Sequence, residues 1–414
     1  MQVIRRIGKH PVLALATAAL LIDPAFAHTG SGIGVDATGQ VYFLDTGSGL
    51  WKIDRDGKLS QVSSTRYHWL AVDANDAFAT TRMPSVRGSD WDITRACTHP
   101  TVLLASDWPI AIGPRGALYY PSGPPGQLKL MRTLPSGESS VFVTFPDSTS
   151  GTALPYVNGI AGGPDGSVYY TEDSSIRRIR SKGEISTFAT IPELADGPSI
   201  PGTPLHPYLR GLAVDPKGVV YVADNGDARV LKITPDGKIT TILRTRSPWS
   251  PTAVTLFGDD VYVLEFLHTS RDVRADWFPL VRKIAPDGSD TILATIDQMP
   301  GARRAVPPPP TAVQDLKAVA QGSAACRLDW KAPAPSGDGD EALLGSVSHY
   351  RIERRARKRS GESIEDWGSW AGTSTETSAI VKGLSSDVEY EFRVTAVNAG
   401  GRAAPSATAK TVIP

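Results

Sequence analysis

The segment GLAVDPKGVVYVAD, from Gly211 to Asp224, contains the pattern that decides the fold. An apolar run leads into an Asp-Pro-Lys-Gly turn, and a run of alternating residues centred on Val-Tyr follows. The next segment, LKITPDGKI from Leu231 to Ile239, places an Asp-Gly turn between two further alternating runs. Period-two alternation around turns in which Gly accepts a positive φ predicts β-hairpins. Together the two segments predict one four-stranded antiparallel unit.

The same unit recurs along the chain. Its first half returns as GIGVDATGQVYFLD from Gly32 and GIAGGPDGSVYYTED from Gly159, and its second half as WKIDRDGKL from Trp51. The turn positions are spaced by 37 to 52 residues and are Asp36, Asp73, Gly113, Gly163, Asp215 and Leu256. This spacing is typical of propeller blades. We therefore predict an all-β fold with a six-bladed β-propeller over residues 28–300, in which the second unit departs from the pattern over residues 81–100.

A change of composition follows the propeller. Residues 301–311, GARRAVPPPPT, contain four consecutive prolines, which favour an extended, semi-rigid spacer. In the remaining residues, 312–414, the segment CRLDW places Cys326, Leu328 and Trp330 on one face of a strand. The segment VKGLSSDVEYEFRVTAVNAGG resembles the last hairpin of a fibronectin type III domain, with Tyr390 at the tyrosine-corner position. The resemblance implies a small β-sandwich.

The amino terminus has the features of a secretory signal peptide. Basic residues precede an apolar run from Pro11 to Ile22, and Ala25-Phe26-Ala27 supplies small residues for cleavage after residue 27. The run is shorter than the roughly 20 apolar residues of a membrane span. We expect a secreted or periplasmic protein that begins at His28 and is not inserted in a membrane.

The charge balance argues against a nucleic-acid partner. The chain has 43 Lys plus Arg and 43 Asp plus Glu, so no net field attracts polyanions. Only two cysteines occur, Cys97 and Cys326, and they fall in different predicted domains. We expect two free, buried thiols, although the exported compartment leaves a bridge between them open.

The propeller units resemble NHL repeats and, more loosely, the six-bladed group of regucalcin, gluconolactonases and virginiamycin B lyase-like proteins. That resemblance implies a site at one mouth of the central channel, and for the regucalcin-like lactonases a metal held by acidic and amide residues. Asn158 matches one of those positions. At the others, Ser31 or Gly32 stands where a Glu is implied, and Arg210 replaces an acidic residue.

Matching positions in the repeats place two rings of residues at this mouth, because antiparallel neighbours begin and end at the same side. The side chains that we predict to bind a ligand are His68, Trp108, Asn158, Arg210, Glu172 and Glu265. A divalent cation, calcium or zinc, is the cofactor that oxygen ligands would hold. The candidate metal ligands are Asp45, Asn158, Glu172, Asp224 and Glu265. A structural alternative exists for Asp45 and Asp224, which could hydrogen-bond the backbone of the blade turns.

Three functions fit these features. The first is an exported protein that binds a small molecule, glycan or peptide at the propeller mouth, with the fibronectin domain as a spacer or docking module. The second is a metal-dependent hydrolase or lyase at the same mouth, and the third is a scaffold for other exported proteins. The propeller histidines, His68, His99, His206 and His268, are expected at the surface or in turns. The sequence leaves open whether the protein is an enzyme.

Overall fold

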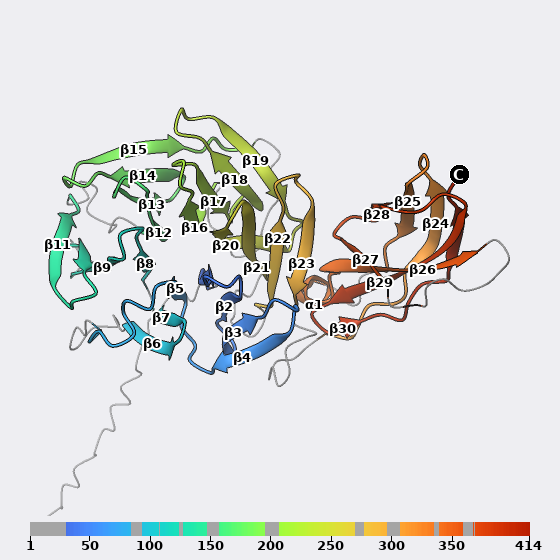
Figure 1. Ribbon diagram of the computed structural model, residues 1–414, viewed down its shortest axis with the longest axis horizontal. Coiled ribbons are helices and arrows are strands. Elements are labelled where there is room, and N and C mark those ends of the chain that lie inside the picture. Colours follow the sequence, from blue (N-terminus) through green and yellow to red (C-terminus); the bar gives the residue numbers. More distant parts are fainter. Residues whose placement is uncertain are drawn as a thin grey trace, which may run out of the picture.

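The computed structural model describes residues 30–83, 93–106, 108–123, 127–146, 157–194, 207–269, 277–295, 307–334, 339–358, 367 and 369–414. The predicted signal peptide lies outside these residues. The described chain is almost entirely β-structure and contains a six-bladed propeller beside a β-sandwich (Figure 1). The predicted fold class is therefore confirmed. Within the described residues, no helix has the length and apolar character needed to cross a membrane.

Five of the six blades are four-stranded meanders in which each strand pairs with the next. Blade 1 contains β1 (Ile33–Val35), β2 (Val41–Asp45), β3 (Gly49–Ile53) and β4 (Leu59–Ser63). Blade 3 contains β8 (Ala111–Ile112), β9 (Leu118–Ser122), β10 (Lys129–Thr133) and β11 (Ser139–Thr144). Blade 4 contains β12 (Gly159–Gly162), β13 (Val168–Glu172), β14 (Ser175–Ile179) and β15 (Ile185–Thr190). Blade 5 contains β16 (Leu209–Val214), β17 (Val220–Asp224), β18 (Arg229–Ile233) and β19 (Ile239–Arg244). Blade 6 contains β20 (Trp249–Phe257), β21 (Asp260–Leu267), β22 (Pro279–Ile284) and β23 (Asp290–Ala294).

Blade 2 differs from the predicted repeat. Its described strands are β5 (Trp69–Asp73), β6 (Ile93–Thr98) and β7 (Thr101–Ala105), in the order β5-β7-β6. The departure begins before the predicted residues 81–100, because residues 77–80 already form turns. Phe78 is buried there beneath the blade, and β7 takes the place beside β5. Its apolar sequence, TVLLA, explains why β7 occupies this fully buried position.

The propeller core lies between neighbouring blades. Each of six hydrophobic clusters contains residues of two adjacent blades, and the last joins blade 6 to blade 1 through side chains such as Trp51, Phe43 and Leu264. The described strands of each propeller blade come from one continuous part of the chain. The ring therefore closes by packing and by the hydrogen bond from Thr252 Oγ1 to the Gly30 carbonyl, 2.7 Å long.

The carboxy-terminal domain is a two-sheet sandwich. One sheet contains β24 (Gln314–Ala320), β25 (Ala325–Lys331) and β28 (Ser378–Lys382). The other contains β27 (Ser369–Ser374), β26 (His349–Lys358), β29 (Val388–Asn398), β30 (Gly401–Arg402) and β31 (Ala409–Val412). As predicted, Cys326, Leu328 and Trp330 are all buried on one face of β25. The Tyr390 hydroxyl accepts a 3.1 Å hydrogen bond from the Ser385 amide, which confirms the tyrosine corner.

The sandwich packs against blade 6 (Figure 1). Leu344, at the end of α1 (Gly339–Leu344), and Ala399 belong to the same buried cluster as the blade 6 residues. The Ile292 amide donates to Thr373 Oγ1 at 3.3 Å, and Arg246 pairs with Glu376. Residues 301–306 of the predicted spacer lie outside the described residues. Pro308, within the rest of it, accepts a 2.9 Å hydrogen bond from Asn398 Nδ2, so this part of the linker is bound to the sandwich.

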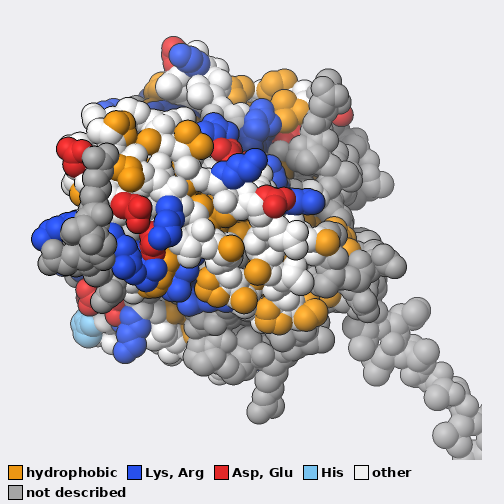
Figure 2. All heavy atoms as spheres, turned by 90° about the vertical axis from the view of Figure 1, so that its right-hand side faces the viewer, with side chains coloured by type: hydrophobic (Ala, Val, Ile, Leu, Met, Phe, Trp, Pro, Cys, Tyr) orange, Lys and Arg blue, Asp and Glu red, His pale blue; other side chains and the backbone are white. Residues whose placement is uncertain are grey.

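Basic, acidic and apolar side chains are interspersed on the molecular face that Figure 2 shows. This mixing agrees with the equal numbers of basic and acidic residues in the sequence. Cys97 is half-buried and Cys326 is buried, and both are free thiols, as expected.

Candidate functional site

The two ends of the propeller are defined by the direction of the strands. We call the end where the first strand of each blade begins and the second strand ends the mouth end. The opposite end carries the repeated Asp and Gly turns, and we call it the turn end. Every blade is antiparallel, so the two rings of residues predicted from the repeats do lie at the mouth end.

Two of the predicted ligand-binding residues lie side by side across blades 4 and 5. Asn158 Nδ2 donates to the Leu209 carbonyl at 3.2 Å, and Thr171 Oγ1 donates to the Arg210 carbonyl at 2.9 Å. A Cβ added to Gly159 would lie 2.6 Å from the Arg210 carbonyl oxygen. Only glycine permits this approach, so the repeated Gly that follows Asn158 brings Asn158 and Arg210 together.

Tyr208 completes this group. Its ring lies 5.6 Å from the Arg210 guanidinium carbon, and its hydroxyl is 3.5 Å from Asn158 Oδ1. Asn158, Tyr208 and Arg210 are all half-buried. The sequence analysis missed Tyr208, although a signal was present: aromatic residues stand two positions before the matched residue in three successive blades, at Tyr156, Tyr208 and Trp249. Tyr156 lies outside the described residues.

A buried histidine lies at the mouth end of the next blade, blade 6. His268 follows β21, is only 3% exposed, and has no hydrogen-bond partner for Nε2 among the described residues. Burial, together with the charge of Arg210, lowers the pKa of His268 to about 3. The expectation of a surface histidine is wrong here, because the apolar strand β21 extends as far as Leu267. His68 is also buried, with Nδ1 2.6 Å from the Ser106 carbonyl, whereas His99 is exposed as expected. His206 lies outside the described residues.

The acidic side chains at this end serve the blades. Glu265 is 1% exposed and pairs with Arg282 of the next strand, with 2.6 Å between Oε1 and Nε. Burial raises the pKa of Glu265, and the Arg282 charge opposes this rise. Asp45 accepts a hydrogen bond from the Gly47 amide at 3.1 Å, as the structural alternative required. These carboxylates hold their own strands and turns.

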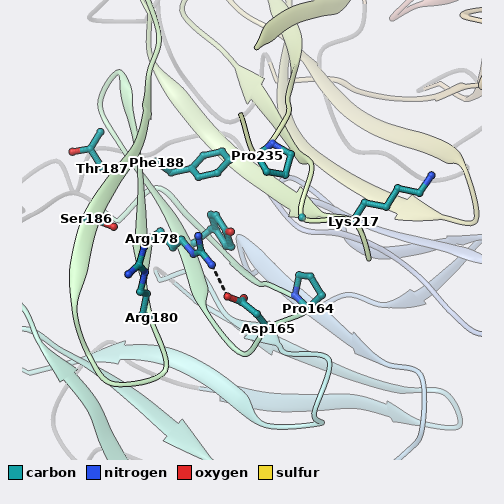
Figure 3. Close-up of a pocket in the computed structure, with 11 residues that line it drawn as sticks. Pro164, Asp165, Arg178, Arg180, Ser186, Thr187, Phe188, Lys217 and Pro235 are labelled. Carbon is teal, nitrogen blue, oxygen red and sulfur yellow. Dashed lines mark hydrogen bonds and ion pairs between the residues drawn. The ribbon is translucent and has the colours of Figure 1, made fainter. Parts of the chain in front are cut away.

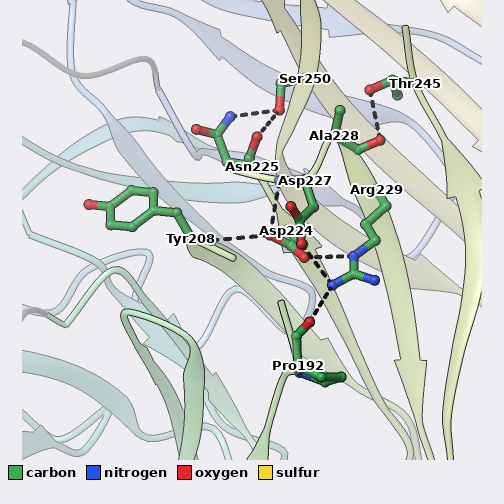
Figure 4. Close-up of polar contacts among 9 residues, drawn as sticks. All are labelled: Pro192, Tyr208, Asp224, Asn225, Asp227, Ala228, Arg229, Thr245 and Ser250. Atoms are coloured by element: carbon green, nitrogen blue, oxygen red, sulfur yellow. Dashed lines mark hydrogen bonds and ion pairs between the residues drawn. The ribbon is translucent and has the colours of Figure 1, made fainter. Parts of the chain in front are cut away.

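Asp224 belongs to a buried network (Figure 4). Its Oδ2 lies 2.7 Å from Arg229 Nε, and Arg229 Nη2 lies 2.9 Å from Asp227 Oδ2. Arg229 Nη2 also donates to the Pro192 carbonyl at 3.2 Å, which joins blade 5 to the segment after β15. Burial raises the pKa of Asp224 to about 6, against the lowering effect of Arg229. Because Asp224 Oδ1 accepts from the Tyr208 amide at 3.2 Å, the network also fixes the start of β16.

The predicted metal site is not assembled by the described residues. Asp224 and Glu265 are committed to arginines, Glu172 lies 3.8 Å from Arg177 Nε, and Asn158 bonds the backbone of the next blade. No group of three or more His, Cys, Asp or Glu side chains in the described ranges could hold a metal ion. Trp108, a predicted ligand contact, is half-buried and packs on the cluster between blades 3 and 4. A calcium or zinc centre made of this set stays a prediction.

A cleft of about 410 Å³ lies near the turn end between blades 4 and 5 (Figure 3). Tyr169 and Phe188 line it with Arg178, Arg180 and Lys217. Much of this lining is repeated elsewhere. The Asp165, Arg178 and Tyr169 arrangement returns in blade 6 as Asp260, Lys283 and Tyr262, and the edge-to-face contact of Tyr169 with Phe188 returns as that of Tyr119 with Phe142. The cleft thus reflects the blade pattern.

Comparisons with known proteins identify both parts of the chain. Residues 308–412 match the fibronectin type III domain, and residues 132–265 match the SMP-30/gluconolactonase/LRE-like region. The chain therefore combines a propeller region of this kind with a fibronectin type III domain.

Individual relatives match parts of the chain. A titin homolog from Caenorhabditis elegans is 43% identical over 83 residues, which is 20% of this chain and, to the nearest per cent, 0% of that protein. Virginiamycin B lyase from Staphylococcus aureus is 17% identical, with 64% of this chain and 83% of that chain covered and a TM-score of 0.37. A calcium-binding protein, regucalcin, from Agrobacterium tumefaciens is 17% identical, with 57% and 81% covered and a TM-score of 0.39.

Proposed function

We propose that this chain is an exported binding protein whose propeller mouth receives a small molecule, glycan or peptide. The observation that carries the proposal is the grouping of Asn158, Tyr208 and Arg210 at the mouth end. Asn158 and Arg210 differ from their counterparts in the other blades, so the needs of the repeated fold do not explain these two residues. A half-buried aromatic ring beside an amide and a guanidinium is a combination that small-ligand sites use.

Export is the second part of the proposal. It rests on the amino-terminal basic residues, the apolar run and the Ala25-Phe26-Ala27 cleavage signal. Mass spectrometry of material exported by a bacterial host should find a chain beginning at His28. Retention of residues 1–27 in exported material would contradict this part alone. The fibronectin domain, docked on blade 6, would present the propeller to other exported proteins.

The binding function is tested with the mature chain and a panel of neutral oligosaccharides, short peptides and small metabolites, detected by thermal shift. A compound that binds at the mouth should lose affinity in Tyr208→Ala and keep it in Lys217→Ala, which alters the cleft of Figure 3. Loss of about tenfold corresponds to one good contact of roughly 1.4 kcal/mol. If every compound found responds to Lys217→Ala instead, the mouth is not the binding site.

A second candidate function is a metal-dependent hydrolase or lyase at the same mouth. The match of residues 132–265 to the SMP-30/gluconolactonase/LRE-like region supports this candidate. Elemental analysis of protein purified without chelator or affinity-tag metal separates the two. About one equivalent of calcium or zinc, lost on Asn158→Ala, would favour the enzyme. Metal-free protein that binds a panel compound would favour the binding protein.

A further inference from the structure

Arg180, which lines the turn-end cleft of Figure 3, is not part of the blade pattern. It begins the turn between the third and fourth strands of blade 4, where its amide donates to the Glu184 carbonyl at 2.9 Å. The same backbone hydrogen bond occurs in blades 1, 3, 5 and 6, where the residues at this position are Asp54, Leu134, Thr234 and Ala285. Among these blades, only blade 4 carries a cation at this position.

The neighbouring blade supplies a second cation to the same cleft. Lys217 precedes Gly218 in the turn between the first two strands of blade 5. The residues at this position in blades 1, 3 and 4 are Thr38, Arg115 and Asp165. Because Arg180 is the one cation at its own position, no other pair of these blades combines two cations in this way. Like charges that line one cleft repel each other, so the repeated fold does not account for the combination.

Both cations can turn to a ligand. Arg180 Nη1 lies 3.5 Å from Glu184 Oε2, but the two side chains are 56% and 66% exposed. An ion pair exposed to this extent contributes little to stability, because water screens it. Lys217 is also exposed, and no acidic side chain of the described residues pairs with it. Arg178, by contrast, is paired with Asp165 and belongs to the wall of the cleft.

The cleft also offers apolar and backbone groups. Phe188 and Tyr169 meet edge to face, with 5.2 Å between the ring centroids. Figure 3 shows Phe188 directed toward Pro235 of blade 5, with Arg180 and Lys217 to either side of these two residues. β15, which carries Phe188, is the outermost strand of blade 4, and no described strand pairs with its outer edge. A ligand in the cleft can therefore contact two cations, an aromatic ring and the open edge of a strand.

Blade 6 shows that an outer strand of this propeller can receive a partner. The Ile292 amide of β23 donates to Thr373 Oγ1 of the sandwich at 3.3 Å. Leu344 and Ala399 of the sandwich pack in the same buried cluster as blade 6 residues. There the partner is the second domain of the same chain. β15 has the same position in blade 4 as β23 in blade 6, without a neighbour of this kind among the described strands.

We infer that the cleft between blades 4 and 5 is a docking site for an acidic, extended peptide segment of a partner protein. Two carboxylates of the segment pair with Arg180 and Lys217, and an apolar side chain between them contacts Phe188. The backbone of the segment runs along the open edge of β15, as in other peptide complexes at sheet edges. Successive side chains of an extended peptide point to opposite sides, so the acidic and apolar contacts come from alternate residues.

The size and place of the cleft fit this occupant. Its volume of about 410 Å³ holds a few residues rather than a folded domain. It lies at the opposite end of the propeller from the mouth, so the inference goes beyond the proposed function and does not rest on it.

Isothermal titration of the mature chain with a pentapeptide blocked at both ends tests the inference. The peptide has glutamate at its first and last positions, leucine at the centre and serine between them. We expect it to bind, with affinity reduced tenfold or more in Arg180→Gln with Lys217→Gln, because charge-assisted contacts are lost. The same peptide with glutamine in place of glutamate should bind at least tenfold more weakly. Added sodium chloride should weaken binding of the acidic peptide.

The matched control is Arg55→Gln with Lys58→Gln, which removes two exposed cations from the corresponding turn of blade 1. Its affinity for the acidic peptide should equal that of the unaltered chain. Tyr208→Ala at the mouth should also leave this affinity unchanged, so failure of the proposed function and failure of this inference give different results.

Three results overturn the inference: no binding of the acidic peptide at millimolar concentration, unchanged affinity in Arg180→Gln with Lys217→Gln, or equal binding of the glutamine peptide. A fourth is an acidic oligosaccharide that binds more tightly than the peptide and depends on the same two cations. That result would assign the cleft to a glycan.

Discussion

The turn end and the mouth end of the propeller use polar residues in opposite ways. At the turn end the same arrangement returns in blades 1 and 5: Asp36 accepts from the Thr38 and Gln40 amides at 2.8 and 3.0 Å, and Asp215 accepts from the Lys217 and Val219 amides at 2.8 and 2.9 Å. Glycines such as Gly39 and Gly218 follow with positive φ. At the mouth end the residues differ between blades, and several buried polar atoms lack a partner in the described structure.

This difference separates folding from recognition within one repeat. A polar residue that recurs in several blades and hydrogen-bonds the backbone of its own turn stabilises each of those hairpins in the same way. A residue found in one blade only, with part of its hydrogen-bonding capacity unused, adds little to the fold. Some residues at the mouth end are nevertheless structural: Glu265 and Asp224 form buried ion pairs with arginines of the neighbouring strands. The comparison is sharpest where both kinds of residue lie in one blade.

The largest effect is expected at Glu265. Glu265→Ala leaves the Arg282 guanidinium, itself 2% exposed, without its buried partner. We expect the free energy of unfolding to fall by about 3–5 kcal/mol, as for other broken buried pairs. Chemical denaturation measures this loss. The double variant Glu265→Leu with Arg282→Met should recover most of it, and a loss below about 1 kcal/mol in the single variant would return Glu265 to the list of ligand contacts.

The sequence predicted the fold and the mouth end, and the reason is physical. Blades repeat because each must pack on two neighbours, so turn and core residues recur and can be aligned. Ion pairs are decided by register between strands: Glu265 meets Arg282 only because β21 pairs with β22 so that Glu265 lies opposite Leu280. The residue-by-residue pairing of two strands cannot be derived from the sequence of one repeat unit. For this reason the sequence analysis interpreted Glu265 and Asp224 as candidate ligands and did not predict their ion pairs.

The strand order of blade 2 and the burial of His268 were not predicted, for different reasons. The strand order of blade 2 departs from the repeat, so alignment of the repeats could not give it. His268 was expected at the surface, although the run of β21 from Val261 to Leu267, apolar except for Glu265, indicated burial. The predicted ligand-binding role of Asn158 and Arg210 remains a prediction, and the structure adds that the two lie together with Tyr208.

A second effect is expected from pH. The pKa of His268 is lowered to about 3 by burial and by Arg210, whereas an unfolded chain binds that proton near pH 6.5. The unfolded state therefore gains protons first, and stability falls as the pH drops from about 6.5 toward 3. At pH 5 the contribution is about 2 kcal/mol.

Denaturation of the unaltered chain and of His268→Gln at pH 7.5 and pH 5 isolates this contribution. The variant should lose about 2 kcal/mol less between the two pH values. Asp224, whose raised pKa of about 6 acts in the opposite direction, is present in both proteins and cancels. Equal losses in the two proteins would show that His268 is accessible to protons and that the rim around it is open.

A smaller effect is expected at the turn end. Asp36→Ala removes the acceptor of two backbone amides in the first turn of blade 1. We expect a loss of about 1 kcal/mol: the carboxylate is only 2% exposed, but Thr38 is exposed and Gln40 half-buried, so water replaces part of the bonding to their amides. Ligand affinity at the mouth should not change. A variant that folds normally but binds a ligand of the mouth more weakly would contradict the division of roles between the two ends.

The smallest effect on stability is expected at Arg210, and its counterpart is Arg229 of the same blade. Arg229 is 4% exposed and bonds Asp224, Asp227 and the Pro192 carbonyl, so Arg229→Gln should cost about 3–5 kcal/mol. Arg210 is half-buried and contacts the face of Tyr208 at 5.6 Å, an interaction of about 0.5–1 kcal/mol. We therefore expect Arg210→Gln to lower the free energy of unfolding by less than Arg229→Gln does, while it weakens ligand binding at the mouth tenfold or more. Denaturation and titration of the two variants in parallel give the comparison. If Arg210→Gln destabilises the chain as strongly as Arg229→Gln, Arg210 holds blades 4 and 5 together, and its absence from the other blades must be explained by the fold.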